Sequence, residues 1–114
     1  MAVVFARDVQ TVRIFEDGEL RVRFVAEGMN YLGFNVRLGT SAGYGVTWDR
    51  KGVEGMGGAE RALVFRLEGD RVTATLDGAP QAVETRSANR KGTLHFSAVG
   101  GRLRIKSIDF RPLP

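Results

Sequence analysis

RLEGDRVTATLDGAP, residues 66–80, sets a pair of turn residues on each side of one short run. The pairs Gly69-Asp70 and Asp77-Gly78 supply the positive φ angles that two-residue hairpin turns require. In the run between them, residues 71–76, apolar side chains alternate with polar ones. This alternation has the period of a strand with one buried face. The stretch therefore predicts the middle strand of an antiparallel meander.

Turn signals of the same kind recur along the whole chain and separate short alternating runs. That spacing is typical of an all-β sandwich or barrel. We predict an all-β fold, an antiparallel two-sheet β-sandwich that forms a single domain over residues 1–114. The predicted strands cover residues 3–6, 12–15, 20–26, 32–38, 43–49, 62–68, 71–76, 81–84, 93–99 and 103–110.

The predicted strands each present an apolar face, and these faces name the core. The inward residues are Leu20, Val22, Phe24, Phe34, Val36, Leu38, Leu63, Phe65, Leu67, Leu94, Phe96 and Ala98. Two sheets stacked about 10 Å apart on such faces give a sandwich core. In the last strand the apolar parity changes between Ile105 and Ile108. This change predicts a β-bulge near Lys106 and Ser107.

Composition limits the chemistry that the chain can perform. The 114 residues are 43% hydrophobic and include no cysteine, so a core can form without disulfides or cysteine-bound metal. The formal net charge is +4 and the sequence pI is about 10.1. A basic domain favours anionic partners, but no long basic block occurs and most aromatics have core parity. Nucleic acid is therefore an unfavoured partner.

Two kinds of targeting segment, a membrane span and a signal peptide, can be sought in the sequence. No apolar run approaches the length that crosses a membrane, and the first residues lack the apolar segment of a signal peptide. We expect no membrane span, and a location that is either cytoplasmic or that of a processed exported domain.

Residues 50–60, RKGVEGMGGAE, form the one long segment without strand alternation. Its four glycines disfavour regular structure, so we predict a mobile loop. Loops of this kind often carry functional sites. The segment lacks the Gly-Lys-Ser/Thr ending of a phosphate-binding loop.

Three motifs in the C-terminal part follow the order found in a known family. They are GDRVTATLDG at residues 69–78, GTLHF at 92–96 and LRIKSI at 103–108. With YLGFNVRLGTSAGYGVTWD in the middle, residues 20–114 resemble concanavalin A-like jelly-roll domains. The resemblance is closest to the 3-keto-disaccharide hydrolase-like group, also called domain of unknown function 1080. It implies a compact jelly roll. Gly45 stands where that group commonly has an acidic residue, which lowers the expectation of hydrolysis.

Catalytic groups do not converge in the sequence. His95, the only histidine, is on the polar face of a predicted strand without an acid at fixed spacing, so no nucleophile–base triad can be assembled. Asp49 and Glu54 flank the glycine-rich segment and could act as paired carboxylates of a glycosidase, or be exposed turn acids. No Asp, Glu or His cluster has metal-ligand spacing. We therefore expect no catalytic residue, metal or cofactor.

The polar face opposite the core supplies the candidate ligand-binding residues. Alternation places Asn35 and Arg37 on one strand beside Thr47 and Asp49 on the next, and we expect Arg21 and Arg23 on the other side. The resemblance to jelly-roll lectins implies that such a face hydrogen-bonds and stacks on sugars. Tyr31 is the surface aromatic, whereas Tyr44 and Trp48 share core parity. The candidate set is Arg37, Asn35, Tyr31, Thr47, Asp49, Arg21 and Arg23.

Two expectations concern the basic residues. Arg37→Ala should leave the melting temperature nearly unchanged and weaken binding of the ligand, because a planar guanidinium suits carboxylates and paired hydroxyls. Arg102, Arg104 and Lys106 share one face of the last strand. With Arg111 they form either an anion or partner patch, or a solvated face that prevents edge association.

The resemblance and the missing catalytic set favour a non-catalytic binding module that recognises carbohydrate or docks onto a protein partner. One alternative is an accessory or structural subunit of a larger assembly, whose basic stripes would meet acidic partner surfaces. A second alternative is a minimal hydrolase acting on glycosides, for which the fold alone gives support.

Overall fold

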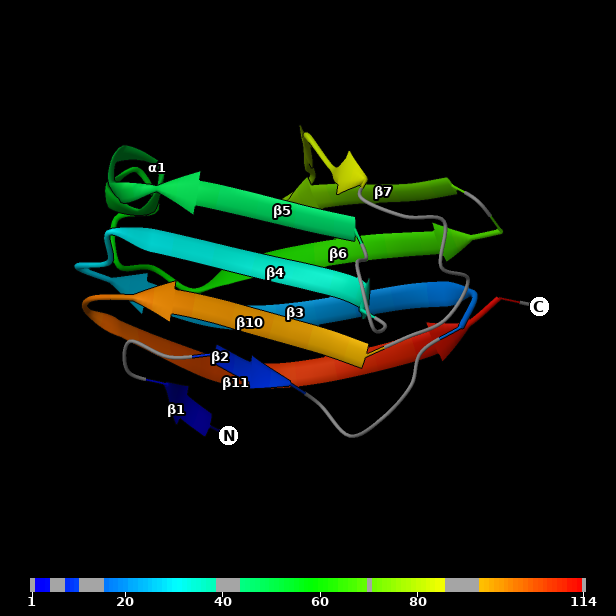
Figure 1. The fold of residues 1–114 in the computed structure, drawn as a ribbon, viewed down its shortest axis with the longest axis horizontal. Helices are drawn as coiled ribbons and strands as arrows, with labels where there is room; N and C mark the ends of the chain where they lie inside the picture. Colours follow the sequence, from blue (N-terminus) through cyan, green and yellow to red (C-terminus); the bar gives the residue numbers. More distant parts are fainter. Residues whose placement is uncertain are drawn as a thin grey trace.

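Two antiparallel sheets make up the protein, as a computed structural model shows for residues 2–4, 8–10, 16–38, 44–69, 71–85 and 93–113. Sheet A has the order β1 (Ala2–Val4), β11 (Arg102–Pro112), β3 (Gly18–Glu27), β6 (Arg61–Glu68), β7 (Arg71–Leu76) and β8 (Ala79–Gln81). Sheet B has the order β2 (Asp8–Gln10), β10 (Thr93–Val99), β4 (Tyr31–Leu38), β5 (Tyr44–Asp49) and β9 (Glu84–Thr85). In Figure 1, sheet B lies in front of sheet A, so the predicted two-sheet β-sandwich is confirmed.

The meander predicted from residues 66–80 is present as β6, β7 and β8. Asp77 and Gly78 have φ angles of 49° and 85° and join β7 to β8 in a two-residue turn. Gly69, between β6 and β7, has a φ of 57°. Positive φ angles at both central positions are the requirement of the tight hairpin turn. The prediction is therefore confirmed for Asp77-Gly78 and for Gly69, whereas Asp70 lies outside the described residues.

The core lies between the sheets and includes the predicted inward residues. The described members of that set are buried, with Ala98 and Phe96 exposed by only 2% and 3%. Leu38 lies outside the described side chains. Phe24 of sheet A and Phe34 of sheet B have ring centroids 5.0 Å apart. Phe96 of sheet B lies edge-on to Phe34 at 5.5 Å, so aromatic rings join the two layers.

The predicted bulge in the last strand is confirmed. In the β11–β3 ladder, Ile105 is opposite Phe24 and Ser107 is opposite Arg23, so one residue of β11 has no partner position. After this shift Phe110 lies opposite Leu20 and packs against the core. The bulge thus restores the inward parity of the end of the strand.

The strands differ from the prediction at two places, and one predicted strand cannot be compared with the structure. Residues 12–15 lie outside the described residues. The strand β2 at residues 8–10 was not predicted. The predicted strand at residues 81–84 is two short strands on different sheets, β8 and β9, because the chain leaves sheet A after Gln81 and enters sheet B at Glu84.

The prediction of a mobile loop at residues 50–60 is wrong. The helix α1 (Arg50–Glu54) follows β5, and backbone hydrogen bonds continue through the turns after it. Val53 and Met56, three residues apart, are exposed by 2% and 3% and pack into the core. Burial of these two side chains holds the segment against the end of the sandwich, at the left in Figure 1. In the described ranges, no helix has the length and apolarity to cross a membrane.

Candidate functional site

The outer face of sheet B brings together the candidate residues of β4 and β5. Tyr31, Gly33 and Asn35 alternate with buried Leu32 and Phe34, so they face away from the core. In the ladders they lie opposite outward positions of β5 and β10. The three rows across the face are Val99–Tyr31–Asp49, Ser97–Gly33–Thr47 and His95–Asn35–Gly45.

Two glycines let the Tyr31 and Asn35 side chains lie along this face. A Cβ atom on Gly33 would be 2.8 Å from the phenol oxygen of Tyr31. A Cβ atom on Gly45 would be 2.5 Å from Oδ1 of Asn35. Each glycine therefore provides the space that its neighbour's polar tip occupies. We call the surface formed by Tyr31, Gly33, Asn35, Gly45 and Thr47 the tyrosine platform.

Sequence reasoning identified Tyr31 and Asn35 but not the role of the glycines. Glycine inside a strand often marks a place where another group approaches the backbone closely. Gly33 and Gly45 are in strand interiors, which is the signal that could have found them. The absence of a side chain at Gly45 leaves the space that the Asn35 amide fills.

Asp49 has a structural partner. It is the N-cap of α1, and its Oδ1 accepts a hydrogen bond of 2.9 Å from the Gly52 backbone N–H. Glu54, the other proposed carboxylate, accepts a hydrogen bond of 3.2 Å from Nε of Arg50 one turn earlier in the helix. Both acids are exposed and both support local structure. Thr47 is exposed at the middle of the tyrosine platform.

The aromatic residues divide as their parity predicts. Tyr44 is exposed by only 3% and belongs to the core. Trp48 is half-buried and packs on the core, with its ring 6.1 Å from that of Phe34 in an edge-on arrangement. Tyr31 is half-buried on the outer face. It is therefore the aromatic side chain that the tyrosine platform offers to a ligand.

The predicted position of Arg21 and Arg23 beside Asn35 is wrong. Both arginines are exposed on β3, and β3 pairs with β6 and β11 in sheet A. The chain passes from sheet A to sheet B between β3 and β4, so these two strands are consecutive in sequence but not neighbours in a sheet. Arg37 belongs to β4, but its side chain lies outside the described part of the structure.

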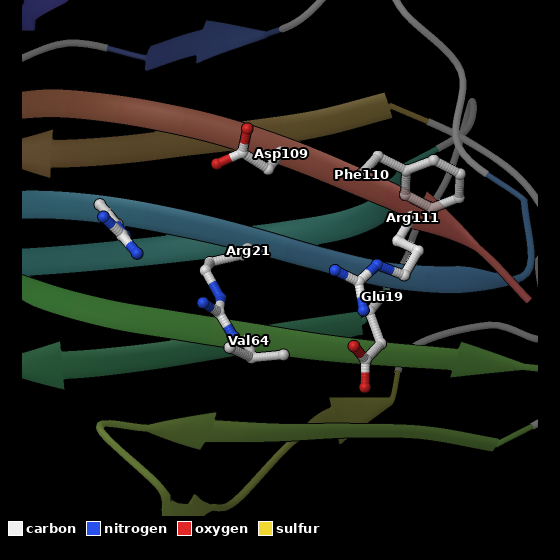
Figure 2. A pocket seen from close by; sticks show the side chains of 7 residues that line it. Glu19, Arg21, Val64, Asp109, Phe110 and Arg111 are labelled. Atoms are coloured by element: carbon white, nitrogen blue, oxygen red, sulfur yellow. The ribbon is translucent and has the colours of Figure 1, made fainter.

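Arg21 and Arg23 instead line a hollow on the outer face of sheet A. Its volume is about 350 Å³, and Figure 2 shows side chains from β3, β6 and β11 around it. The lining residues are Glu19, Arg21, Arg23, Val64, Asp109, Phe110 and Arg111. The candidate set is thus split between two opposite faces of the sandwich.

Known proteins resemble this chain in fold. No protein-family model and no curated protein matches it. A galectin of Caenorhabditis elegans, LEC-6, is a solved structure with a TM-score of 0.64 and 18% identity, over 96% of this chain and 95% of that one. The carbohydrate-binding module CBM66 from Bacillus subtilis gives 0.63 and 13%, over 90% and 80% of the two chains.

A candidate glycosyl hydrolase from Parabacteroides distasonis is also similar, with a TM-score of 0.72 and 13% identity over 94% of this chain and 83% of that one. These likenesses show the fold, a jelly-roll β-sandwich. The narrower resemblance to the 3-keto-disaccharide hydrolase-like group stays a prediction.

Proposed function

We propose that this protein is a non-catalytic carbohydrate-binding module and that the tyrosine platform holds a neutral saccharide. The observation that carries the proposal is the pair of side chains laid over glycines, Tyr31 over Gly33 and Asn35 over Gly45. The arrangement gives an aromatic ring and an amide side by side on an open sheet face.

The chemistry of these groups matches that of a sugar ring. An aromatic side chain offers an apolar surface to the C–H face of a sugar. The Asn35 amide both donates and accepts hydrogen bonds, as does the Thr47 hydroxyl, so both can pair with sugar hydroxyls. Tyr31 is opposite Val99 and Asp49, and the carboxylate of Asp49 is engaged as the N-cap of α1. The next row of the face carries uncharged Ser97 and Thr47. A neutral saccharide requires no charged partner, and this composition suits one.

The fold supports the same proposal. LEC-6 is a galectin and CBM66 is a carbohydrate-binding module, and both share the sandwich over most of its length. Fold likeness at 13–18% identity does not transfer a function by itself. The proposal therefore depends on the side chains of the tyrosine platform.

Calorimetric titration with a panel of neutral oligosaccharides, selected on a glycan array, tests the proposal. We expect Tyr31→Ala to weaken binding about tenfold, because loss of one aromatic contact costs roughly 1 kcal/mol or more. Asn35→Ala should weaken it by a similar factor. Thr73→Ala, an exposed threonine on β7 of sheet A, is the matched control and should bind like the wild type.

Two results would contradict the proposal. One is an array on which no neutral saccharide binds, which would leave protein docking as the remaining role of this face. The other is a bound saccharide whose affinity is the same for Tyr31→Ala as for the wild type.

A further inference from the structure

The hollow on the outer face of sheet A has three guanidinium groups and an apolar part. Arg21 and Arg23 come from β3 and Arg111 comes from β11. In Figure 2, Arg21 extends from β3 toward Val64 of β6, and Arg111 extends from β11 toward Glu19. Val64 of β6, which is half-buried, adds an apolar side chain to the lining. Cationic and apolar groups therefore line the same space.

The three arginines are not held by acids of the described chain. Its ion pairs engage Arg50, Arg61 and Arg66, and none within the described residues engages Arg21, Arg23 or Arg111. Asp109 is opposite Arg21 in the β11–β3 ladder, yet its carboxylate points away from Arg21 in Figure 2. Glu19 instead forms an ion pair with Arg66, in which Oε1 of Glu19 is 3.5 Å from Nη1 of Arg66. The guanidinium groups are thus available to an external anion.

We propose that this hollow binds a saccharide that carries a carboxylate or sulfate group. The anionic group would accept paired hydrogen bonds from the planar guanidinium forks of Arg21 and Arg111. The apolar face of the sugar ring would pack against Val64. Its hydroxyls would donate to Glu19 and Asp109, which are acceptors only.

The two carboxylates of the hollow favour a saccharide over a polymer that carries a negative charge on every unit. Glu19 and Asp109 line the same space as the arginines, so the formal charges of the lining are mixed. An acidic peptide or a nucleic acid places a negative charge at every step and would be repelled by these acids. An acidic saccharide has one anionic group among several hydroxyl donors, which fits both signs of charge. This site is separate from the tyrosine platform and stands independently of it.

The test is titration calorimetry of the full chain at physiological salt with four probes. They are 3′-sialyllactose, which has a single carboxylate, 3′-sulfolactose, which has a single sulfate, polyglutamate, and neutral lactose. We expect one or both acidic saccharides to bind, and Arg21→Gln and Arg111→Gln each to weaken that binding at least tenfold, since a hydrogen bond to a charged group is worth about 1.5–3 kcal/mol. Arg71→Gln is the matched control, because Arg71 is exposed on β7 outside the hollow and carries the same charge.

The outcomes separate the alternatives. Tighter binding of 3′-sialyllactose would identify a carboxylate as the recognised group, and tighter binding of 3′-sulfolactose would identify a sulfate. Absence of binding to both acidic saccharides would overturn the proposal. So would an equal loss with Arg71→Gln, or equal binding of polyglutamate, because either result indicates unspecific attraction to a basic surface. Tyr31→Ala should leave binding of the acidic saccharide unchanged, so failure of the two proposed sites can be told apart.

Discussion

Asp77 shows how one side chain fixes the turn at the end of β7. Its φ of 49° is unusual for a residue other than glycine, and aspartate tolerates it better than most residues. Oδ1 accepts a hydrogen bond of 2.9 Å from the Ala62 N–H, and Oδ2 accepts one of 3.0 Å from Arg61. The Asp77 N–H in turn donates to the Ala62 carbonyl at 2.9 Å. The turn is therefore tied to the start of β6.

These bonds predict a pH dependence of stability. The Ala62 N–H, and then Arg61, lower the pKa of Asp77 below its ordinary value of 3.8. Because the folded-state pKa is the lower one, the stabilisation is present above the unfolded pKa and is lost as pH falls through the folded pKa. Thermal melts between pH 6 and 2.5 should show a larger loss below about pH 4 for the wild type than for Asp77→Asn. Parallel curves for the two proteins would contradict this role.

The glycines of the tyrosine platform predict that stability and binding can be separated. A methyl group on Gly45 would meet only the flexible end of Asn35 at close range, so Gly45→Ala should move that amide. We expect a melting temperature within a few degrees of wild type and severalfold weaker binding of a neutral saccharide. Gly101→Ala is the contrasting variant, because its φ is +56° and its Cβ would clash with the Glu27 carbonyl. Thermal melts should show a large loss of stability for that protein alone.

At the scale of the element, α1 depends on its surroundings more than on its own sequence. It has five residues, one of them glycine, and so short a helix is unstable alone. The helix is stabilised by the Asp49 cap and by the buried side chains of Val53 and Met56. The strands could be predicted from sequence because the alternation of apolar and polar residues is a local pattern. The helix α1 could not be predicted in this way, because it depends on an N-cap and on two side chains that pack against distant parts of the chain.

The N-cap hydrogen bond of Asp49 predicts that two substitutions at this position will differ in their effect on stability. Asp49→Ala removes the bond to the Gly52 N–H and should lower the free energy of unfolding by about 0.5–2 kcal/mol. Asp49→Ser retains an oxygen that can cap and should lose much less. Urea denaturation measures both. If Asp49→Ser is stable yet weak toward saccharide, the carboxylate also contacts the ligand, and if its binding is unchanged, Asp49 serves as a cap.

At the scale of the molecule, aromatic rings connect the two sheets. Phe34 contacts Phe24 across the sandwich and lies edge-on to Phe96 and Trp48. Phe34→Ala should therefore cost about 3–5 kcal/mol of unfolding free energy, the range for truncation of a buried phenylalanine. Phe34→Leu, which leaves a smaller cavity, should cost less. Urea denaturation of both variants measures the difference, and an equal cost would show that volume at this position is unimportant.

The arrangement of strands explains which parts of the candidate site could be predicted. Tyr31 and Asn35 face outward because Leu32 and Phe34 face inward, and that relation lies within one strand. The partnership of β3 with β11 joins residues far apart in the chain, and no local pattern in the sequence identifies it. For that reason the outward direction of Arg21 was predicted correctly and its neighbours were not.

Within the described residues, the outermost strands of both sheets are short. Sheet A ends in β1 and β8, of three residues each, and sheet B ends in β2 and β9, of three and two residues. Long open edges invite other chains to add strands, which is how β-rich proteins aggregate into fibrils. Pro80 in β8 removes one amide donor from its strand. The tapering of both sheets therefore protects this β-rich chain from self-assembly at high concentration.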